Sequence, residues 1–322
     1  MNIRPAGQQS RAICILGMHR SGTSSVARAV NLLGAYLGEE DKVGEVSPDN
    51  PKGYWEHIEL RDLQTHLLKE LDRRWDTATP LPDDWVQSPA ACRAKEQLAA
   101  LVKSRFGGQP LWAWKEPQSC LLVPLWREVL DQLGIELACV FVVRNPSDMA
   151  GSLVKRDSFF FNQALGLWYH YNLVALQDTA GLPVFFLSYE RYVASWEPEL
   201  RRCAAALGLN WPADDRALRT GMDSFIDPKL RHHQSPPERL LELPRPVQEL
   251  YQVLSTACRT SESHRDLWEE TIRRLSSEFH TYASFFQRAP IPPKSPWLNR
   301  TLHRWHKSIK KRLPHAAGAV AR

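Results

Sequence analysis

Two glycines near the start of the chain are spaced as in loops that bind phosphate. Gly17 and Gly22 have four residues between them, and a hydroxyl residue, Ser24, follows two places on. Glycines let backbone N–H groups turn inward, and a helix N-terminus adds unpaired donors and the positive end of its dipole. The segment is therefore expected to bind an anion; the alternative is a strand–turn–helix that holds no ligand.

The positive charge of this loop is placed differently from that of the nucleotide hydrolases. Where their loop carries a lysine before the Ser/Thr, this chain has Thr23, and its cation is Arg20 instead. In those proteins the lysine reaches the β- and γ-phosphates. The loop is therefore expected to suit a nucleotide without such phosphates, and no apolar run ends in an aspartate that could hold magnesium.

A second anion site is predicted where Arg144 closes the most strand-like run of the chain, residues 136–143. Pro146 suits the start of a helix, and Ser152 lies eight residues after Arg144. A guanidinium together with a hydroxyl can clamp a phosphate. The segment is thus a candidate for the other end of a common ligand.

Short apolar runs precede each of these chemical groups and alternate with segments of helical spacing. The predicted strands are residues 12–16, 111–114, 136–143 and 183–187. The predicted helices follow residue 22, residue 56 and residue 146 and cover 90–106, 121–133, 162–179, 236–258 and 260–287. This order predicts an α/β fold, a parallel sheet flanked by helices, with a P-loop-like nucleotide site and a helical C-terminal part. Ligands bind such sheets beyond the carboxyl ends of the strands.

Composition narrows the class of protein. The 322 residues are 43% hydrophobic and include 12 Trp, enough for a large core, and the aromatic stripe Trp168, Tyr169 and Tyr171 is predicted to pack there.

The six cysteines show no paired spacing, so neither a zinc site nor a disulfide framework is expected. No signal peptide or 18-residue apolar run is found, which predicts a cytoplasmic protein.

The C-terminal 30 residues differ from the rest of the chain. Residues 293–322 carry eight Lys or Arg and no Asp or Glu, whereas the whole chain has a net charge of only +5. We therefore expect one domain over 1–292, a basic amphipathic tail over 293–322 and no nucleic-acid partner. Residues 294–322 could contact a membrane surface, or could be a solvated terminus.

With both anion motifs in place, the chain resembles the PAPS-dependent sulfotransferases, especially their bacterial, carbohydrate and tyrosylprotein branches. The resemblance covers about residues 13–192 and includes Leu-Trp-Ala-Trp-Lys-Glu-Pro and Ser-Tyr-Glu segments. It implies 3′-phosphoadenosine 5′-phosphosulfate (PAPS) as cofactor, no metal, and a hydroxyl-bearing acceptor, a glycan or a glycolipid. The residues that it implies for the 5′ end of PAPS are Arg20, Ser21, Gly22, Thr23 and Ser24, and those for the 3′-phosphate are Arg144 and Ser152.

The same resemblance implies the catalytic groups. Arg20 would stabilise the transition state, and Lys115 resembles the lysine of the family's Lys-Asp-Pro segment, with Glu116 replacing the aspartate. The catalytic base would be Glu56 or His57, because family members use either a Glu or a His at this step. The alternative is that Glu56 has no catalytic role and only caps the following helix. A late basic loop with Lys229 and Arg231 could cover the nucleotide or be solvated surface.

The sequence therefore favours a PAPS-dependent sulfotransferase. A P-loop small-molecule kinase is the rival enzyme, and Thr23 in place of lysine speaks against it. A non-catalytic, nucleotide-binding scaffold attached to a membrane is the rival from another class.

Overall fold

A computed structural model describes residues 10–39, 41, 43, 46, 50, 52–226, 235–260 and 268–282. All of these lie in one compact unit, Met1–Gln287. Several predicted features fall outside the described residues, namely the amphipathic tail with its membrane contact, the end of the predicted domain at residue 292, and the late basic loop with Lys229 and Arg231.

The centre of the unit is a sheet of four parallel strands. They are β1 (Arg11–Leu16), β2 (Leu111–Lys115), β3 (Glu136–Val143) and β4 (Val184–Ser188), in the spatial order β2-β1-β3-β4. The register pairs Ile15 with Lys115, Leu16 with Phe141 and Val143 with Ser188, so all four carboxyl ends lie at one edge. The predicted parallel α/β sheet is confirmed.

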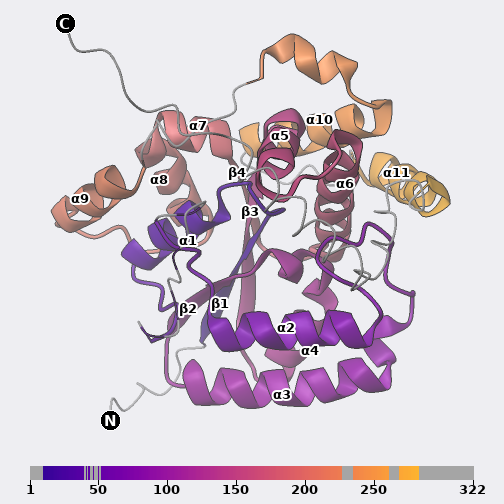
Figure 1. Ribbon diagram of the computed structural model, residues 1–322. Helices are drawn as coiled ribbons and strands as arrows, with labels where there is room; N and C mark the ends of the chain where they lie inside the picture. The colour runs from indigo at the N-terminus through magenta and orange to yellow at the C-terminus, as the bar shows by residue number, and fades with distance from the viewer. Residues whose placement is uncertain are drawn as a thin grey trace, which may run out of the picture. The chain divides into compact units, whose positions relative to one another are not determined.

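Helices cover both faces of this sheet because the strand residues alternate between two hydrophobic clusters. In β3, Cys139 and Phe141 join one cluster, whereas Val140 and Val142 join the other. The second cluster is closed by α1 (Thr23–Leu32), α8 (Trp196–Ala206) and α9 (Arg216–Phe225), which lie together on one side of the sheet (Figure 1).

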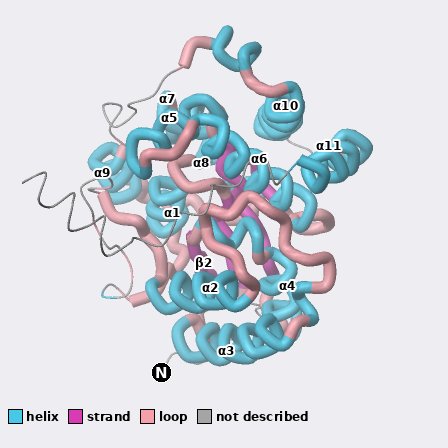
Figure 2. Tube along the Cα trace, turned by 45° about the vertical axis from the view of Figure 1, so that its right-hand side comes forward, coloured by secondary structure: helices cyan, strands magenta, loops and turns pink. Residues whose placement is uncertain are grey.

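The larger cluster lies under most of the other helices. These are α2 (Ile58–Glu70), α3 (Pro89–Arg105), α4 (Val123–Gln132), α5 (Pro146–Asp157), α6 (Phe161–Asp178), α10 (Arg245–Arg259) and α11 (Glu269–Tyr282). Figures 1 and 2 both show α2 and α3 side by side. Trp168, Tyr169 and Tyr171 of α6 are buried in this cluster, which confirms that the aromatic stripe is core packing.

The boundaries of some helices differ from the prediction. The segment 121–133 begins as a 3-10 helix, η3 (Pro117–Leu121), before α4, and a short η2 (Trp85–Gln87) precedes α3. The segment 236–258 divides into η5 (Pro237–Glu242) and α10, because Pro244 and Pro246 lack an N–H and suit only the start of a helix. Three helices, α7 (Tyr189–Ala194), α8 and α9, occupy a region where no helix was predicted.

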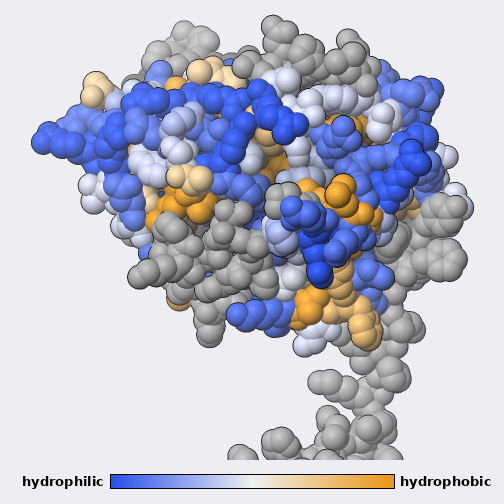
Figure 3. Space-filling model, turned by 90° about the horizontal axis from the view of Figure 1, so that it is seen from above, coloured by the Kyte–Doolittle hydropathy of each residue, from blue (hydrophilic) through white to orange (hydrophobic). Residues whose placement is uncertain are grey.

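Figure 3 shows a face of the molecule that carries mostly hydrophilic side chains. On the face shown in Figure 3, apolar residues form small separate patches among hydrophilic ones. Within the described part of the chain, no helix has the length and apolar character needed to span a bilayer.

Candidate functional site

The glycine loop makes a tight turn at the carboxyl end of β1. Gly17 and Gly22 have φ of 147° and 87°, in the region that favours glycine, and Arg20 also has a positive φ of 68°. A β-carbon at Gly22 would lie 2.2 Å from the ring of Tyr189, and one at Gly17 would lie 2.9 Å from the carbonyl oxygen of Val142. Both glycines are therefore required by the backbone and by their neighbours.

The two predicted anion motifs are in direct contact. Arg20 Nε donates to Ser152 Oγ at 3.0 Å, and Arg144 donates to the carbonyl oxygen of Arg20 at 2.5 Å. The guanidinium of Arg144 also lies 4.7 Å from the ring centroid of Tyr189. Residues separated by more than 120 positions thus form one cationic site at the edge of the sheet.

The turn that carries Arg144 is held from several directions. The Asn145 side chain accepts from the N–H of Ser147 at 2.9 Å and so caps α5, while the Asn145 N–H donates to Glu190 at 2.9 Å. Trp168 Nε1 donates to the carbonyl oxygen of Arg144 at 3.1 Å. Because these contacts fix the backbone, the buried guanidinium has a defined position.

Unsatisfied donors show that the site fits an anionic ligand. Ser21 Oγ, Ser147 Oγ and Arg144 Nε are buried and have no hydrogen-bond partner among the described residues. A buried donor without an acceptor is costly, and phosphate oxygens would satisfy these three. These residues therefore fit an anionic ligand such as one with phosphate groups.

Other polar groups of the loop already have partners. The N–H of Gly17 donates to Cys120 Sγ at 3.1 Å, so it points toward the core and not toward a ligand. By contrast, Thr23 and Ser24 form the first turn of α1, where backbone N–H groups lack intrahelical acceptors and can bind a ligand. Asn50 Nδ2 lies 3.4 Å from Ser24 Oγ. The anion-facing part of the loop is therefore its second half.

Next to this loop, a buried ion pair joins Lys115 and Glu56. Lys115 ends β2 beside Ile15, and its Nζ lies 2.5 Å from Glu56 Oε1. The two side chains are 2% and 12% exposed, respectively. The structure thus brings together two of the predicted catalytic residues, which are 59 positions apart.

The neighbouring base candidate, His57, is placed differently. It is the N-cap residue of α2 and packs against Phe106, with 5.2 Å between the ring centroids, and against Gly38. Glu56 precedes this cap, and the acidic residue in the first turn of α2 is Glu59. Glu56 therefore faces Lys115 instead of capping the helix.

A second carboxyl, Glu116, adjoins the pair. It is 3% exposed, and its Oε1 accepts from Gln118 Nε2 at 3.2 Å. Burial and, next to it, the negative charge of Glu56 raise the pKa of Glu116 to about 8, although Lys115 acts in the opposite direction. Glu56, Lys115 and Glu116 are called the Lys115 triad below.

His19, inside the glycine loop, lies among the cations of the site. Burial lowers the pKa of His19 well below its usual value, and the positive charges of Arg156, Lys115 and Arg20 act in the same direction. Its ring centroid lies 4.8 Å from that of Trp75. The neutral ring therefore sits where three positive side chains converge.

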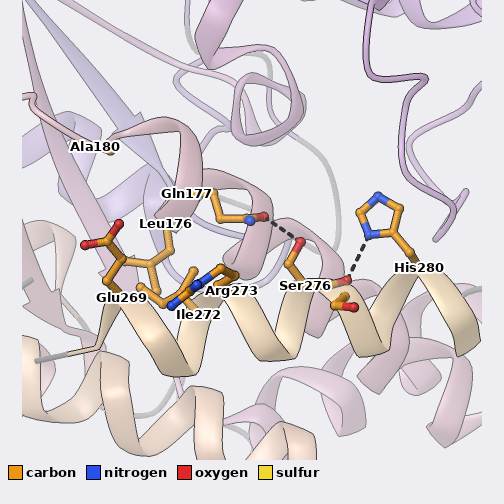
Figure 4. Close-up of a pocket in the computed structure, with 9 residues that line it drawn as sticks. Leu176, Gln177, Ala180, Glu269, Ile272, Arg273, Ser276 and His280 are labelled. Carbon is orange, nitrogen blue, oxygen red and sulfur yellow. Dashed lines mark hydrogen bonds between the residues drawn. The ribbon is translucent and has the colours of Figure 1, made fainter. Parts of the chain in front are cut away.

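A cavity of about 550 Å³ lies elsewhere, between α6 and α11 (Figure 4). Ser276 Oγ donates to Gln177 at 3.4 Å, and His280 Nδ1 bonds the carbonyl oxygen of Ser276 at 2.8 Å. None of the predicted site residues that the structure describes lines this cavity. The chemistry that the sequence indicates is at the edge of the sheet instead.

No group of three or more His, Cys, Asp or Glu side chains in the described ranges is placed to hold a metal ion.

Sequence reasoning assigned no role to three residues that shape the site. Tyr189 packs on Gly22 and on Arg144, Cys120 binds the N–H of Gly17, and Glu116 completes the Lys115 triad. Tyr189 and Glu116 adjoin strand ends, which is a signal for residues near a site in a parallel sheet. Cys120 carries no such signal, because it is 103 positions away from Gly17.

Comparisons with known proteins give structural neighbours only. No protein-family model matches the chain, and no curated protein matches it. The sulfotransferase domain from the olefin synthase of Synechococcus PCC 7002 is 18% identical, covers 80% of this chain and 97% of its own, and has a TM-score of 0.42. The sulfotransferase domain from the curacin biosynthetic pathway is 15% identical, covers 96% and 100%, and has a TM-score of 0.35.

A sulfotransferase from Mycobacterium tuberculosis is 12% identical, covers 78% of this chain and 76% of its own, and has a TM-score of 0.37. All three neighbours are sulfotransferases, the family that the two sequence motifs resemble. At these identities and TM-scores, the likeness assigns no activity to the chain.

Proposed function

We propose that this protein is a sulfotransferase that moves a sulfuryl group from PAPS to a hydroxyl of an acceptor. The observation that carries the proposal is the contact between the two anion motifs, in which Arg20 bonds Ser152 and Arg144 bonds Arg20. A nucleotide with phosphate groups on both its 3′ and 5′ positions needs two anion sites within one ligand's length. Ser21 and Arg144 supply unsatisfied donors for them.

The Lys115 triad supports the transfer chemistry. When bound, PAPS supplies the sulfuryl group and leaves as 3′-phosphoadenosine 5′-phosphate. Glu56 would accept the proton of the acceptor hydroxyl while the oxygen of that hydroxyl attacks sulfur and the bond from sulfur to the phosphate oxygen breaks. Lys115 and Arg20 provide positive charge for the leaving phosphate, in a site where burial strengthens that effect. These roles need no metal.

Calorimetric binding of 3′-phosphoadenosine 5′-phosphate, AMP, and ATP with magnesium tests the cofactor. We expect the 3′-phosphorylated nucleotide to bind selectively and Arg144→Ala to weaken its binding by about 100-fold, because a charge-assisted contact is lost. Arg127→Ala is the control, since Arg127 is half-buried and, like Arg144, donates to backbone carbonyls, in its case those of Asp178 and Ala180. Preference for ATP with magnesium would replace the proposal by a kinase.

We also propose that the acceptor is a carbohydrate, free or lipid-linked. Two half-buried aromatic rings lie beside the site, because Lys115 Nζ is 6.0 Å from the ring centroid of Tyr54 and Trp75 contacts His19. Aromatic faces of this kind suit the apolar faces of sugar rings. Radiolabelled PAPS should label oligosaccharides, and labelling of phenols or tyrosine peptides alone would contradict this.

The membrane contact through residues 294–322 rests on the sequence alone. It predicts that the full chain sediments with anionic vesicles and that deletion of 294–322 abolishes this. Unchanged partitioning after deletion would remove the membrane contact and, with it, the support for a lipid-linked acceptor.

A further inference from the structure

Glu116 is a buried carboxyl that the proposed transfer does not use. It follows Lys115 directly, is 3% exposed, and its Oε2 has no hydrogen-bond partner among the residues that the structure describes. Its Oε1 accepts from Gln118, whose amide is also bound to Thr65 at 3.0 Å. The surrounding structure thus satisfies one oxygen of a carboxyl but not the second.

The charges around Glu116 show which form it takes. The groups that face it are Glu56 from the segment before α2, Lys115 from β2, Cys14 from β1, Cys120 from η3 and Tyr171 from α6. Burial raises the pKa of the Cys14 thiol, the Cys120 thiol and the Tyr171 phenol, so all three are neutral at physiological pH. Among these groups, Lys115 is the cation.

One buried ammonium cannot compensate two carboxylates. With both ionised, the Lys115 triad would carry a net negative charge in a site that is almost dry, which is costly. Glu56 is more exposed and lies 2.5 Å from the Lys115 ammonium, so it is the carboxyl that this single cation compensates. The proton therefore remains on Glu116.

We propose that Glu116 keeps its proton and acts as a positioning residue that leaves the Lys115 ammonium paired with Glu56 alone. This inference rests on the proposed function, in which Glu56 receives a proton and Lys115 faces the leaving phosphate. An ionised Glu116 would offer the Lys115 ammonium a second acceptor. Lys115 would then be drawn away from Glu56 and from the leaving phosphate. The protonated form avoids this competition.

Infrared titration of the unliganded protein tests the protonation without any nucleotide. The wild type should show a protonated-carboxyl band at neutral pH that disappears as the pH rises through about 8. Glu116→Gln should lose the part of this band that titrates near pH 8, whereas Asp178, whose pKa burial raises to about 7, still contributes at neutral pH and below. Glu199→Gln is the matched control and should retain that part, because Glu199 is a buried carboxylate whose ion-pair partners are Arg191 and Arg202. A neutral-pH spectrum in which Glu116→Gln removes no such band would overturn the proposal.

The positioning role is tested by the affinity for 3′-phosphoadenosine 5′-phosphate as a function of pH. Wild-type affinity should fall several-fold between pH 7 and pH 9, whereas that of Glu116→Gln should stay nearly constant. The same decline in both proteins would exclude the role. Failure of both proteins to bind at any pH would refute the proposed function, while the infrared result would still decide the protonation.

If Glu116→Gln does not fold, Glu116→Asp serves for the infrared assignment. Because the aspartate side chain is shorter, its carboxyl group has different surroundings. The frequency of the protonated-carboxyl band and the pH at its titration midpoint should therefore both shift. An unchanged band in this variant would show that the proton is not on Glu116.

Discussion

The two halves of the strand edge are built in different ways. We call the two motifs around Arg20 and Arg144 the anion half and the Lys115 triad the transfer half. In the anion half, local contacts start the helix of each motif, because Asn145 caps α5 and Gly22 begins α1, and long-range contacts then join the two motifs. In the transfer half, the partner of Lys115, Glu56, comes from a segment 59 positions earlier in the chain. Local sequence therefore shapes the motifs of the anion half, whereas the fold alone pairs Lys115 with Glu56.

The halves also differ in how their polar groups are satisfied. The anion half leaves Ser21 Oγ, Ser147 Oγ and Arg144 Nε without partners among the described residues, as expected of a site that a ligand completes. In the transfer half, Lys115 and Glu56 satisfy each other, and the atom of the Lys115 triad that lacks a partner among the described residues is an acceptor, Glu116 Oε2. We therefore expect substitutions in the transfer half to change stability and those in the anion half to change binding.

The largest expected loss of stability comes from removing one member of the buried Lys115–Glu56 ion pair. Lys115→Met should lower the free energy of unfolding by about 3–5 kcal/mol, because it leaves the Glu56 carboxylate buried without a cation. Urea unfolding of Lys115→Met, Glu56→Gln and the double variant measures the coupling. The Lys95–Glu128 pair, 17% and 45% exposed, is the control and should show a coupling below about 1 kcal/mol.

The pH dependence of stability should reveal Glu116. Its folded pKa of about 8 is above the ordinary value of 4.5, so the folded state binds this proton more tightly than the unfolded state. The free energy of unfolding should therefore fall as the pH rises from 4.5 to 8, by a few kcal/mol. Glu116→Gln should reduce this slope in urea unfolding at several pH values, most clearly between pH 7 and 8, because burial also raises the pKa of Asp178, to about 7, and that group contributes to the slope at lower pH. An identical slope in the variant would assign it to another group.

In the anion half, Gly22→Ala should cost about 3 kcal/mol of stability. Its positive φ accounts for about 1–2 kcal/mol, and the overlap with the Tyr189 ring for the rest. Gly34→Ala separates the two causes, because Gly34 has φ of 98° and open space around it. Equal losses in thermal unfolding of both variants would show that Tyr189 does not constrain the loop.

The smallest expected effect is that of Ser152→Ala. It removes the acceptor of Arg20 Nε, and we expect the affinity for 3′-phosphoadenosine 5′-phosphate to fall about tenfold, or 1.4 kcal/mol, with little change in stability. Ser104→Ala, at an exposed position of α3, is the control for calorimetry. A large loss of stability with unchanged affinity would contradict the division between the two halves.

Much of the fold was predictable from local patterns. The strand at 136–143 matches β3, and the 90–106 helix matches α3 within one residue at each end, because apolar periodicity and Gly107-Gly108 define them. Helix α8 was missed although Leu200, Cys203, Ala204 and Leu207 carry helical spacing. Helix α7 has only six residues, too few for a clear period.

The sequence by itself determined the loop with glycine at positions 17 and 22, the helix that starts at Pro146 after Arg144, and the parallel direction of the strands. These follow from backbone conformation and from periodicity, which are properties of neighbouring residues. Only the tertiary structure decided that Arg20 meets Ser152, that Glu56 rather than His57 faces Lys115, and that Glu116 is buried beside them. Burial and long-range contact set these outcomes, because the energy of a charge depends on what surrounds it in space.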